Sequence, residues 1–477
     1  MVRPHSPIAL AFTLALFNLF SQLTARAEEW QITYAVTQEQ ITGDPKGVAA
    51  PKKEEHSYTL TVALGQLYFA VDHGHARTIY DFTRRRILQL NLAKNEYEDW
   101  SLYSNIAARV REMENRYTMG AASKEAGVDT HSYYERFATE TSLGIALPGI
   151  GQDELKPVIT RKDLPDGGWD FWHDGQSVAQ FIPAKTVLPA LFSIRFGSFL
   201  AYECNLHPEI RRQLIATNGI PQLLVAHWAI LNQQNTATYR LQSVKQPATD
   251  SAVIPSRFKP ASHQEGGANE PILHVIGLIH DRPGPEQRTL RETTERFARE
   301  AISDKRPLDA YLAFLEYRLE SGERHSKDFL QYQQQFAQDK RCQQYVISLD
   351  QSTQDDCRKG LASCDSIDRR GLQKAYMIDL QRADLLQRLG QGHGGMTTVD
   401  EQKQIMAAES LFLKVVTANP YLAGAYHDLG GLYDRTYRQA LAWVCFDTGR
   451  QLSPDHFLFK DITVFEQRLE HDFPDYF

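Results

Sequence analysis

The sequence lacks the short motifs that mark common catalytic and cofactor sites. It contains no Gly-x-Ser-x-Gly elbow, no Gly-Lys-Ser/Thr phosphate loop, no His-Glu-x-x-His pair and no Cys-x-x-Cys-His haem site. The glycines of "GQGHGG", residues 390–395, follow a helical run and not a strand, so they are expected to form a loop and not a dinucleotide fingerprint. No cysteine stands in a papain-like context that would supply a nucleophile. These absences favour a binding role over catalysis, without excluding an enzyme, and they predict no bound cofactor.

Positive charge is also scarce. The chain has 52 lysines and arginines against 59 aspartates and glutamates, for a formal net charge of −7. Nucleic acids and anionic membrane surfaces select proteins with basic stripes. The composition therefore disfavours both kinds of partner. The hydrophobic content of 42% is ordinary for a globular protein with a sizeable core.

Long apolar runs are missing as well. The apolar run Ile8–Phe20 has 13 residues, fewer than the roughly 20 that a membrane-spanning helix needs. Arg3 precedes this run, and Ala25-Arg26-Ala27 follows it as a small-x-small cleavage site. This order predicts a secretory signal peptide over residues 1–27, and therefore export to the periplasm or the extracellular space. We expect a soluble mature chain with no transmembrane segment and a net charge of −9 (−7 − 2, after loss of Arg3 and Arg26).

Cysteine is sparse and odd in number, with five in the chain. Export makes disulfides chemically possible, and Cys342, Cys357 and Cys364 are close enough in sequence for one disulfide among them. Their pairing stays open. On one unbroken helix the Cα atoms of Cys357 and Cys364 would be roughly 10.5 Å apart, too far for a disulfide, unless Gly360 ends the helix between them. Cys445 lies in a helical pattern and is expected in the core.

The first half of the chain is rich in strand-like alternation. Apolar residues recur at every second position in "WQITYAV", "YTLTVAL" and "QLYFAV". Such runs predict half-buried antiparallel strands. The period then changes to that of an amphipathic helix. Its apolar face is formed by Leu102, Ile106, Val110, Met113 and Tyr117. Residues 28–245 are thus predicted to form an α+β domain with a mainly antiparallel sheet.

The stretch "TIYDFTRRRILQLNLAKNEYEDW" and the strands before it, over Glu28–Trp100, resemble the open half-barrels of exported lipid and lipoprotein carriers. The resemblance implies a concave apolar face that could hold an acyl chain or another apolar ligand. It predicts an apolar cavity between the sheet and the Leu102–Tyr117 helix.

A linker and a helical domain follow. Residues 246–271 contain several prolines, a Gly-Gly pair and little periodicity, which is typical of a linker. Helical patterns then continue over residues 272–477. Pro420 and Pro454 close two successive helical runs 34 residues apart. The period predicts stacked helix pairs.

The stretch 421–454 resembles the tetratricopeptide repeat (TPR) family. The residues at the family's pattern positions are Tyr426, Leu429, Gly430, Tyr433, Ala442, Phe446, Gly449 and Pro454. One repeat earlier only the second half fits, with Ala408, Phe412 and Pro420, because Gly390–Val399 interrupts the repeat. The upstream stretch "ADLLQRLG" is then expected to be its first helix. The alternative is an irregular helical bundle that matches the pattern once.

The resemblance implies a groove lined by the first helix of each pair, with His427 and Asp434 facing it. These residues would bind a peptide of a protein partner or a neighbouring domain. Alternatively, the chain's own C-terminal helix, within Asp455–Phe473, fills this groove as a cap.

Two polar clusters contain residue types that could support chemistry. His73 and His75 form a His-x-His pair that could begin a zinc site, but no third ligand is identifiable. In "WDFWHDG", Asp170 or Asp174 could orient His173 as a base. Structural roles are favoured for both clusters, since each lacks the remaining members of a site.

The sequence therefore supports three hypotheses. The first is an exported cell-envelope protein whose TPR-like domain is a protein–protein interaction scaffold. The second is an extracytoplasmic carrier or sensor that binds a lipid or another apolar ligand in the N-terminal domain. The third is a hydrolase or metalloenzyme that uses His73, His75, Asp170 or His173.

Overall fold

The fold is a sheet unit and a helical unit, seen in a computed structural model. The structure describes residues 29–43, 51–127, 135–146, 157–230, 233–246, 254, 256–261, 271–279, 287–323, 327–391 and 398–477. The sheet unit comprises Met1–Ala261 together with Leu469–Phe477, and the helical unit comprises Ser262–Arg468. The predicted α+β class is confirmed. The predicted signal peptide, residues 1–27, lies outside the described residues.

The domain limits differ from the predicted ones at the C-terminus. The prediction assigned the whole of residues 272–477 to the helical domain, whereas Leu469–Phe477 pack with the sheet unit. In sequence, the helical unit is therefore an insertion between two parts of the sheet unit. We call Leu469–Phe477 the tail.

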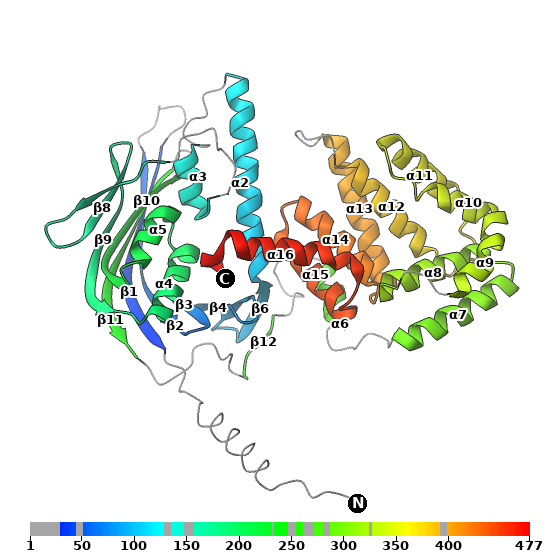
Figure 1. Cartoon of the computed structure of the whole chain (residues 1–477), viewed down its shortest axis with the longest axis horizontal. Helices are drawn as coiled ribbons and strands as arrows, with labels where there is room; N and C mark the ends of the chain where they lie inside the picture. The colour runs from blue at the N-terminus through cyan, green and yellow to red at the C-terminus, as the bar shows by residue number, and fades with distance from the viewer. Residues whose placement is uncertain are drawn as a thin grey trace, which may run out of the picture. The chain divides into compact units, whose positions relative to one another are not determined.

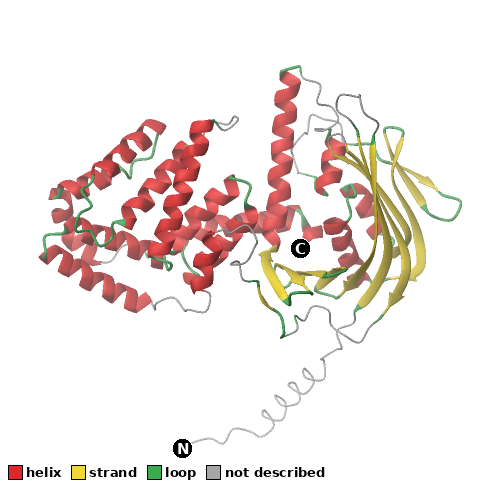
Figure 2. Ribbon diagram, turned by 180° about the vertical axis from the view of Figure 1, so that it is seen from behind, coloured by secondary structure: helices red, strands yellow, loops and turns green. Residues whose placement is uncertain are grey.

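Twelve strands formed by described residues make one mainly antiparallel open sheet (Figure 2). Its order is β12-β6-β5-β4-β3-β2-β1-β11-β10-β9-β8-β7. The bounds are β1 (Trp30–Thr42), β2 (Lys52–Leu64), β3 (Tyr68–His73), β4 (Ala76–Asp81), β5 (Arg86–Asn91), β6 (Glu96–Ser101), β7 (Thr160–Asp163), β8 (Trp169–His173), β9 (Gln176–Val187), β10 (Gly219–Ile230), β11 (Gln233–Lys245) and β12 (Lys259–Pro260). The predicted alternation is seen in β1, where Ile32, Tyr34 and Val36 are buried.

Helices cover one face of the curved sheet (Figures 1 and 2). They are α2 (Leu102–Glu125), α3 (Arg136–Leu143), α4 (Ala190–Glu203) and α5 (Pro208–Ile215). Helix α4 contacts β2 and β3, and its Phe192, Phe196 and Phe199 are buried. The rings of Phe199 and Phe69 meet edge to face, with centroids 6.3 Å apart. Phenyl rings thus pack against this part of the sheet.

The predicted linker takes part in the sheet unit. Lys259 and Pro260 form β12, which pairs parallel to β6 at Glu96 and Tyr97. Phe258 packs in a core on a set of alternating strand positions, namely Ala63, Tyr68, Ala70, Ile79, Leu88 and Leu90. The interpretation of the whole segment 246–271 as a linker was therefore wrong at this point. Phe258 and the two-residue strand β12 are too short a segment to show a periodic pattern in the sequence.

The helical unit is all-helical in the residues described, as predicted. Its elements are α6 (Pro271–Ile279), α7 (Gln287–Ser303), α8 (Pro307–Ser321), α9 (Lys327–Gln338), α10 (Lys340–Ile347), α11 (Gln354–Ser366), α12 (Tyr376–Leu389), α13 (Val399–Ala418), α14 (Ala423–Arg435), α15 (Gln439–Leu452) and η1 (Phe457–Phe459). Helix α16 (Lys460–Asp472) ends within the tail, and η2 (Pro474–Tyr476) follows. Helices pack as consecutive pairs, among them α7 with α8, α12 with α13, and α14 with α15. None of the described helices is long and apolar enough to cross a bilayer.

The α14–α15 pair shows why the pattern residues recur. Tyr426, Leu429, Tyr433, Ala442 and Phe446 are all buried. A Cβ atom on Gly430 would lie 2.4 Å from the Phe446 ring, so glycine lets the two helices approach closely. The stretch "ADLLQRLG" runs to the end of α12, and α12 pairs with α13 as expected for the interrupted repeat.

Gly430→Ala should lower the free energy of unfolding by about 1–3 kcal/mol, because the added methyl group overpacks the contact with Phe446. The matched control is Gly431→Ala, whose Cβ would meet only the Gln387 Nε2 atom at 4.0 Å. Alanine's higher helix propensity should leave that variant unchanged or up to about 1 kcal/mol more stable. Denaturant unfolding of the two variants measures the difference, and equal effects would contradict the close approach.

Candidate functional site

The predicted partner-binding residues lie on α14. His427 Nδ1 is 3.0 Å from Asp428 Oδ1, and His427 Nε2 is 3.5 Å from Asp461 Oδ1 on α16. The imidazole also meets the Phe459 ring of η1 at 5.5 Å between centroids. The C-terminal segment therefore touches His427, whose side chain is 19% exposed. Asp434 lies two helical turns further along α14 and is half-buried.

The predicted disulfide is not formed in the structure. All five cysteines are free, buried thiols. Cys357 and Cys364 both lie on α11, which continues through Gly360, so their Cα atoms are too far apart to be bridged. Cys342 lies on a different helix, α10, where its backbone N–H is capped by Asp339.

The predicted histidine pair on β3 does not gather further ligands. His73 Nε2 is 3.8 Å from Glu203 Oε2 on α4, and its ring lies 5.7 Å from that of Tyr58. His75 is exposed in the turn after β3. Within the described part of the chain, no group of three or more His, Cys, Asp or Glu side chains could hold a metal ion.

Asp170 and His173 do not act as a pair. The Asp170 carboxylate accepts hydrogen bonds from Trp172 Nε1 at 2.7 Å and from Ser177 Oγ at 2.6 Å. It holds the β8–β9 hairpin, where a bulge between Phe171 and Trp172 changes the register. His173 lies instead against α3, and Asp174 Oδ2 is 3.6 Å from its Nε2.

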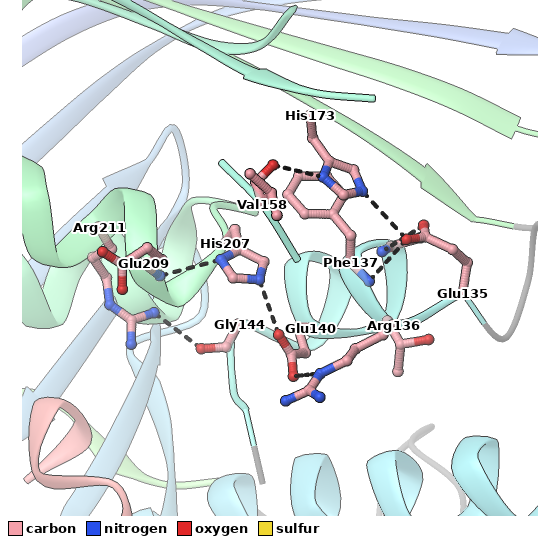
Figure 3. Close-up of polar contacts among 12 residues, drawn as sticks. Glu135, Arg136, Phe137, Glu140, Gly144, Val158, His173, His207, Glu209 and Arg211 are labelled. Carbon is pink, nitrogen blue, oxygen red and sulfur yellow. Dashed lines mark hydrogen bonds and ion pairs between the residues drawn. The ribbon is translucent and has the colours of Figure 1, made fainter. Parts of the chain in front are cut away.

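His173 belongs to a stack of three rings, which we call the histidine stack: His173, Phe137 and His207 (Figure 3). The Phe137 ring lies between the two imidazoles. Its centroid is 4.1 Å from that of His173 and 5.0 Å from that of His207, with interplanar angles of 20° and 8°. The three residues come from the end of β8, the first turn of α3 and the residue before α5.

His207 is fixed at both ring nitrogens. Its Nδ1 accepts a hydrogen bond from the Glu209 backbone N–H at 3.2 Å and so caps α5. Nε2 then carries the proton and donates to Glu140 Oε2 at 2.9 Å, while Arg136 Nε donates to Glu140 Oε1 at 2.9 Å. Burial alone would raise the pKa of the Glu140 carboxyl. The hydrogen bonds and charges of His207 and Arg136 outweigh burial and hold that pKa below its ordinary value.

His173 is held less tightly. Its Nδ1 is 3.2 Å from the Val158 carbonyl oxygen, to which a protonated Nδ1 donates. Its Nε2 is 3.4 Å from Glu135 Oε1, a distance that makes an ion pair when the imidazole is protonated. Glu135 is also the N-cap of α3 and accepts hydrogen bonds from the N–H groups of Phe137 and Ala138 at 3.2 Å. The histidine stack is thus connected to α3 by two glutamates: Glu135 at its N-cap lies near His173, and Glu140 within the helix binds His207.

This arrangement favours a role of the histidine stack in packing and in pH-dependent stability over a role in catalysis. A general base needs a nitrogen within reach of its substrate, whereas both nitrogens of the buried His207 are used inside the chain. Sequence reasoning missed His207, Glu135 and Glu140. His207-Pro208-Glu209 carries a helix-start signal, since proline favours the first helical position and glutamate the first turn. No local signal joins His207 to Glu140.

A second titratable cluster lies in the helical unit at the end of α13, where Asn419 is the C-cap and Pro420 follows. Asn419 Nδ2 donates to Glu316 Oε1 at 2.6 Å and to Glu320 Oε1 at 2.7 Å. Lys374 Nζ is 2.5 Å from Glu316 Oε2, and the Tyr376 hydroxyl donates to Glu316. Burial, followed by the neighbouring charge of Glu316, raises the pKa of Glu320 to about 7. Glu320 therefore titrates near neutral pH.

Comparisons with known proteins do not add a family. No family model matches the chain, and no curated protein matches it.

Glu140→Gln should lower the free energy of unfolding by roughly 2 kcal/mol at pH 7, because charge-assisted hydrogen bonds to His207 and Arg136 are lost. The depressed carboxyl pKa contributes stability that is present above about pH 4.5 and is lost as the pH falls through the folded-state value. The difference between variant and parent should therefore shrink by pH 3. Glu209→Gln is the control, an exposed carboxylate paired with Arg212, and should change stability little.

Glu320→Gln should change the free energy of unfolding in the opposite direction and raise it at high pH. A raised carboxyl pKa means that stability falls as the pH rises from about 4.5 through about 7, because the unfolded chain ionises first. Removing the carboxyl should stabilise the protein at pH 8 by up to about 3 kcal/mol and leave it nearly unchanged at pH 4. Denaturant unfolding at both pH values tests this, with the exposed Glu292→Gln as control. The same pH slope in Glu320→Gln and parent would contradict the assignment.

Proposed function

We propose that this is an exported cell-envelope protein whose helical unit is a TPR-like scaffold that binds a protein partner. The packed helix pairs and the close contact of Gly430 with Phe446 support the TPR-like assignment of residues 421–454. The first helices of successive pairs would then present the binding face. Export remains the expectation from residues 1–27.

The observation that carries the proposal is a row of side chains on three such helices. His427 on α14 and Asp461 on α16 are 34 residues apart, one repeat length, and their side chains lie 3.5 Å apart. Asp428 contacts His427 at 3.0 Å. Burial and then the charge of Asp428 raise the pKa of Asp384 on α12. We call Asp384, His427, Asp428 and Asp461 the acidic row.

The charge of this row indicates the kind of partner. Arg388 Nε lies 3.3 Å from Asp384 and offsets part of one charge. Burial lowers the pKa of His427, but its hydrogen bonds and charge interactions with Asp428 and Asp461 outweigh that effect and raise it. The His427 imidazole can therefore offset a second charge when it is protonated. The three carboxylates still outnumber these cations, which favours a partner segment that carries Lys or Arg.

The position of α16 supports a cap that leaves the row accessible. Glu466 on α16 accepts hydrogen bonds from Trp443 Nε1 at 2.9 Å and from Arg450 Nη1 at 2.7 Å, both on α15. The helix thus packs on the second helix of the last pair, as a further first helix would. The Asp461 side chain remains 67% exposed. We therefore favour the alternative in which α16 caps the last helix pair over the one in which it fills the binding face of the first helices.

The apolar-ligand carrier receives less support. Leu102, Ile106 and Met113 lie on α2, the helix beside which that hypothesis expects a cavity, and all three are buried. Burial is common to a filled core and to the lining of a cavity, so it does not favour the carrier. Binding of a lipid or another apolar ligand by the sheet unit stays a prediction from the sequence.

A photo-crosslinking amino acid at Asp461 should capture one protein from producing cells, whereas the same group at Met406, exposed on the second helix α13, should not. With that protein purified, Asp428→Asn and Asp461→Asn should each weaken binding several-fold, more at low salt than at high salt. Asp400→Asn is the control, since Asp400 is exposed at the start of α13. Equal capture at both positions, or binding that is insensitive to both acidic-row variants, would contradict the proposal.

A further inference from the structure

The tail is bound to the sheet unit through Tyr476, which is 1% exposed. Its hydroxyl lies 2.8 Å from the carbonyl oxygen of Gly144 and 3.1 Å from that of Ala201, and it donates its proton to this pair of acceptors. It accepts a hydrogen bond from Arg109 Nη1 at 3.3 Å. One hydroxyl therefore joins the end of α3, the end of α4 and the middle of α2.

The Tyr476 ring lies among cations and another aromatic ring. The guanidinium carbons of Arg109 and Arg211 are each 5.3 Å from its centroid. The Tyr202 ring meets it edge to face at 5.0 Å, and the Tyr202 hydroxyl donates to the Tyr476 carbonyl oxygen at 3.0 Å. Cations over an aromatic face attract its quadrupole, so this environment selects an aromatic side chain.

Arg211 requires an anion from the tail. Its side chain is 3% exposed, its Nη1 donates to Gly144 O at 3.0 Å (Figure 3), and its Nη2 is 2.9 Å from Asp475 Oδ2. No residue that the structure describes forms a hydrogen bond with its Nε. A buried cation without a counter-ion is strongly destabilising. Asp475 supplies this charge from 264 residues away in sequence.

The two ends of the tail are fixed as well. Glu470 accepts hydrogen bonds from Arg85 Nε at 2.9 Å and from the Tyr103 hydroxyl at 2.6 Å. The Phe477 ring lies 5.3 Å from that of Tyr103, with the Arg85 guanidinium 5.5 Å from its centroid. The contacts thus extend along the tail from Glu470 to Phe477, as they do for a bound peptide.

We infer that the sheet unit carries a recognition site for an acidic-aromatic segment, Asp-Tyr-Phe, and that the tail of a second copy of the chain can replace the chain's own tail there by exchange. The tail is attached to the sheet unit by side-chain and carbonyl contacts, while the inserted helical unit separates the two in sequence. Such a segment can bind its own copy or an identical one with the same contacts. Binding within one chain is favoured at low protein concentration because the tail is tethered. The inference is independent of the proposed role of the acidic row.

The first test uses the chain without Leu469–Phe477 and a fluorescent peptide of that sequence. Saturable binding by fluorescence anisotropy is expected, and the Tyr476→Phe peptide should bind roughly tenfold more weakly because it cannot reach Gly144 and Ala201. Arg211→Ala in the shortened chain should abolish binding, whereas Arg212→Ala, at the exposed neighbouring position, should not. A folded shortened chain that does not bind the peptide would overturn the inference.

The second test decides the case if the shortened chain does not fold. Full-length Arg211→Asp and Asp475→Arg chains each lose the ion pair within one copy, but an exchanged pair of the two restores opposite charges at both sites. Refolded together, they should give a heterodimer by analytical ultracentrifugation. The double variant, with both changes in one chain, restores opposite charges within each copy and should match the parent's oligomeric state at the same concentration. A mixture that yields no heterodimer would count against exchange.

Discussion

The ion pair of the buried Arg211 with the partly exposed Asp475 is the contact on which the arrangement of the sheet unit depends. Arg211 also donates to Gly144, and Gly144 accepts the hydrogen bond of Tyr476. The ends of α3 and α4, the body of α2 and the last residues of the chain therefore meet at one buried polar point. Because a buried guanidinium needs a counter-ion, the sheet unit requires a residue that is synthesised after the whole helical unit.

Buried and half-buried polar groups recur as connectors in both units. In the sheet unit, Glu140 links His207 to Arg136, and Glu135 joins the start of α3 to His173. In the helical unit, Asn419 bridges Glu316 and Glu320 where α13 ends. Hydrogen bonds of Glu140 with His207 and of Asn419 with Glu316, and the approach of Glu135 to His173, each join elements that are distant in sequence. Such contacts make the packing specific and, through Glu140 and Glu320, sensitive to pH in opposite directions.

The helical unit shows how one spacing can produce both a core and a surface. The buried residues of α14 and α15 recur because two helices must approach closely at Gly430 and fill the adjacent space with Tyr433 and Phe446. The same repeat length brings His427 and Asp461 together on neighbouring first helices. A partner-binding role rests on this second consequence, since regular stacking aligns side chains that are not adjacent in sequence.

The sequence by itself determined the α+β class, the strands of the first half, the helix over Leu102–Tyr117 and the paired helices around residues 421–454. Each of these follows from a period of two, a period of 3.6 or a 34-residue repeat, and such patterns are local. Only the tertiary structure decided that Phe258 packs on the sheet, that α11 keeps Cys357 from Cys364, that His207 meets Glu140 and that the tail belongs with the sheet unit. Apart from the α11 case, these depend on contacts between residues far apart in the chain. For α11 the deciding fact is that the helix passes through Gly360 without ending.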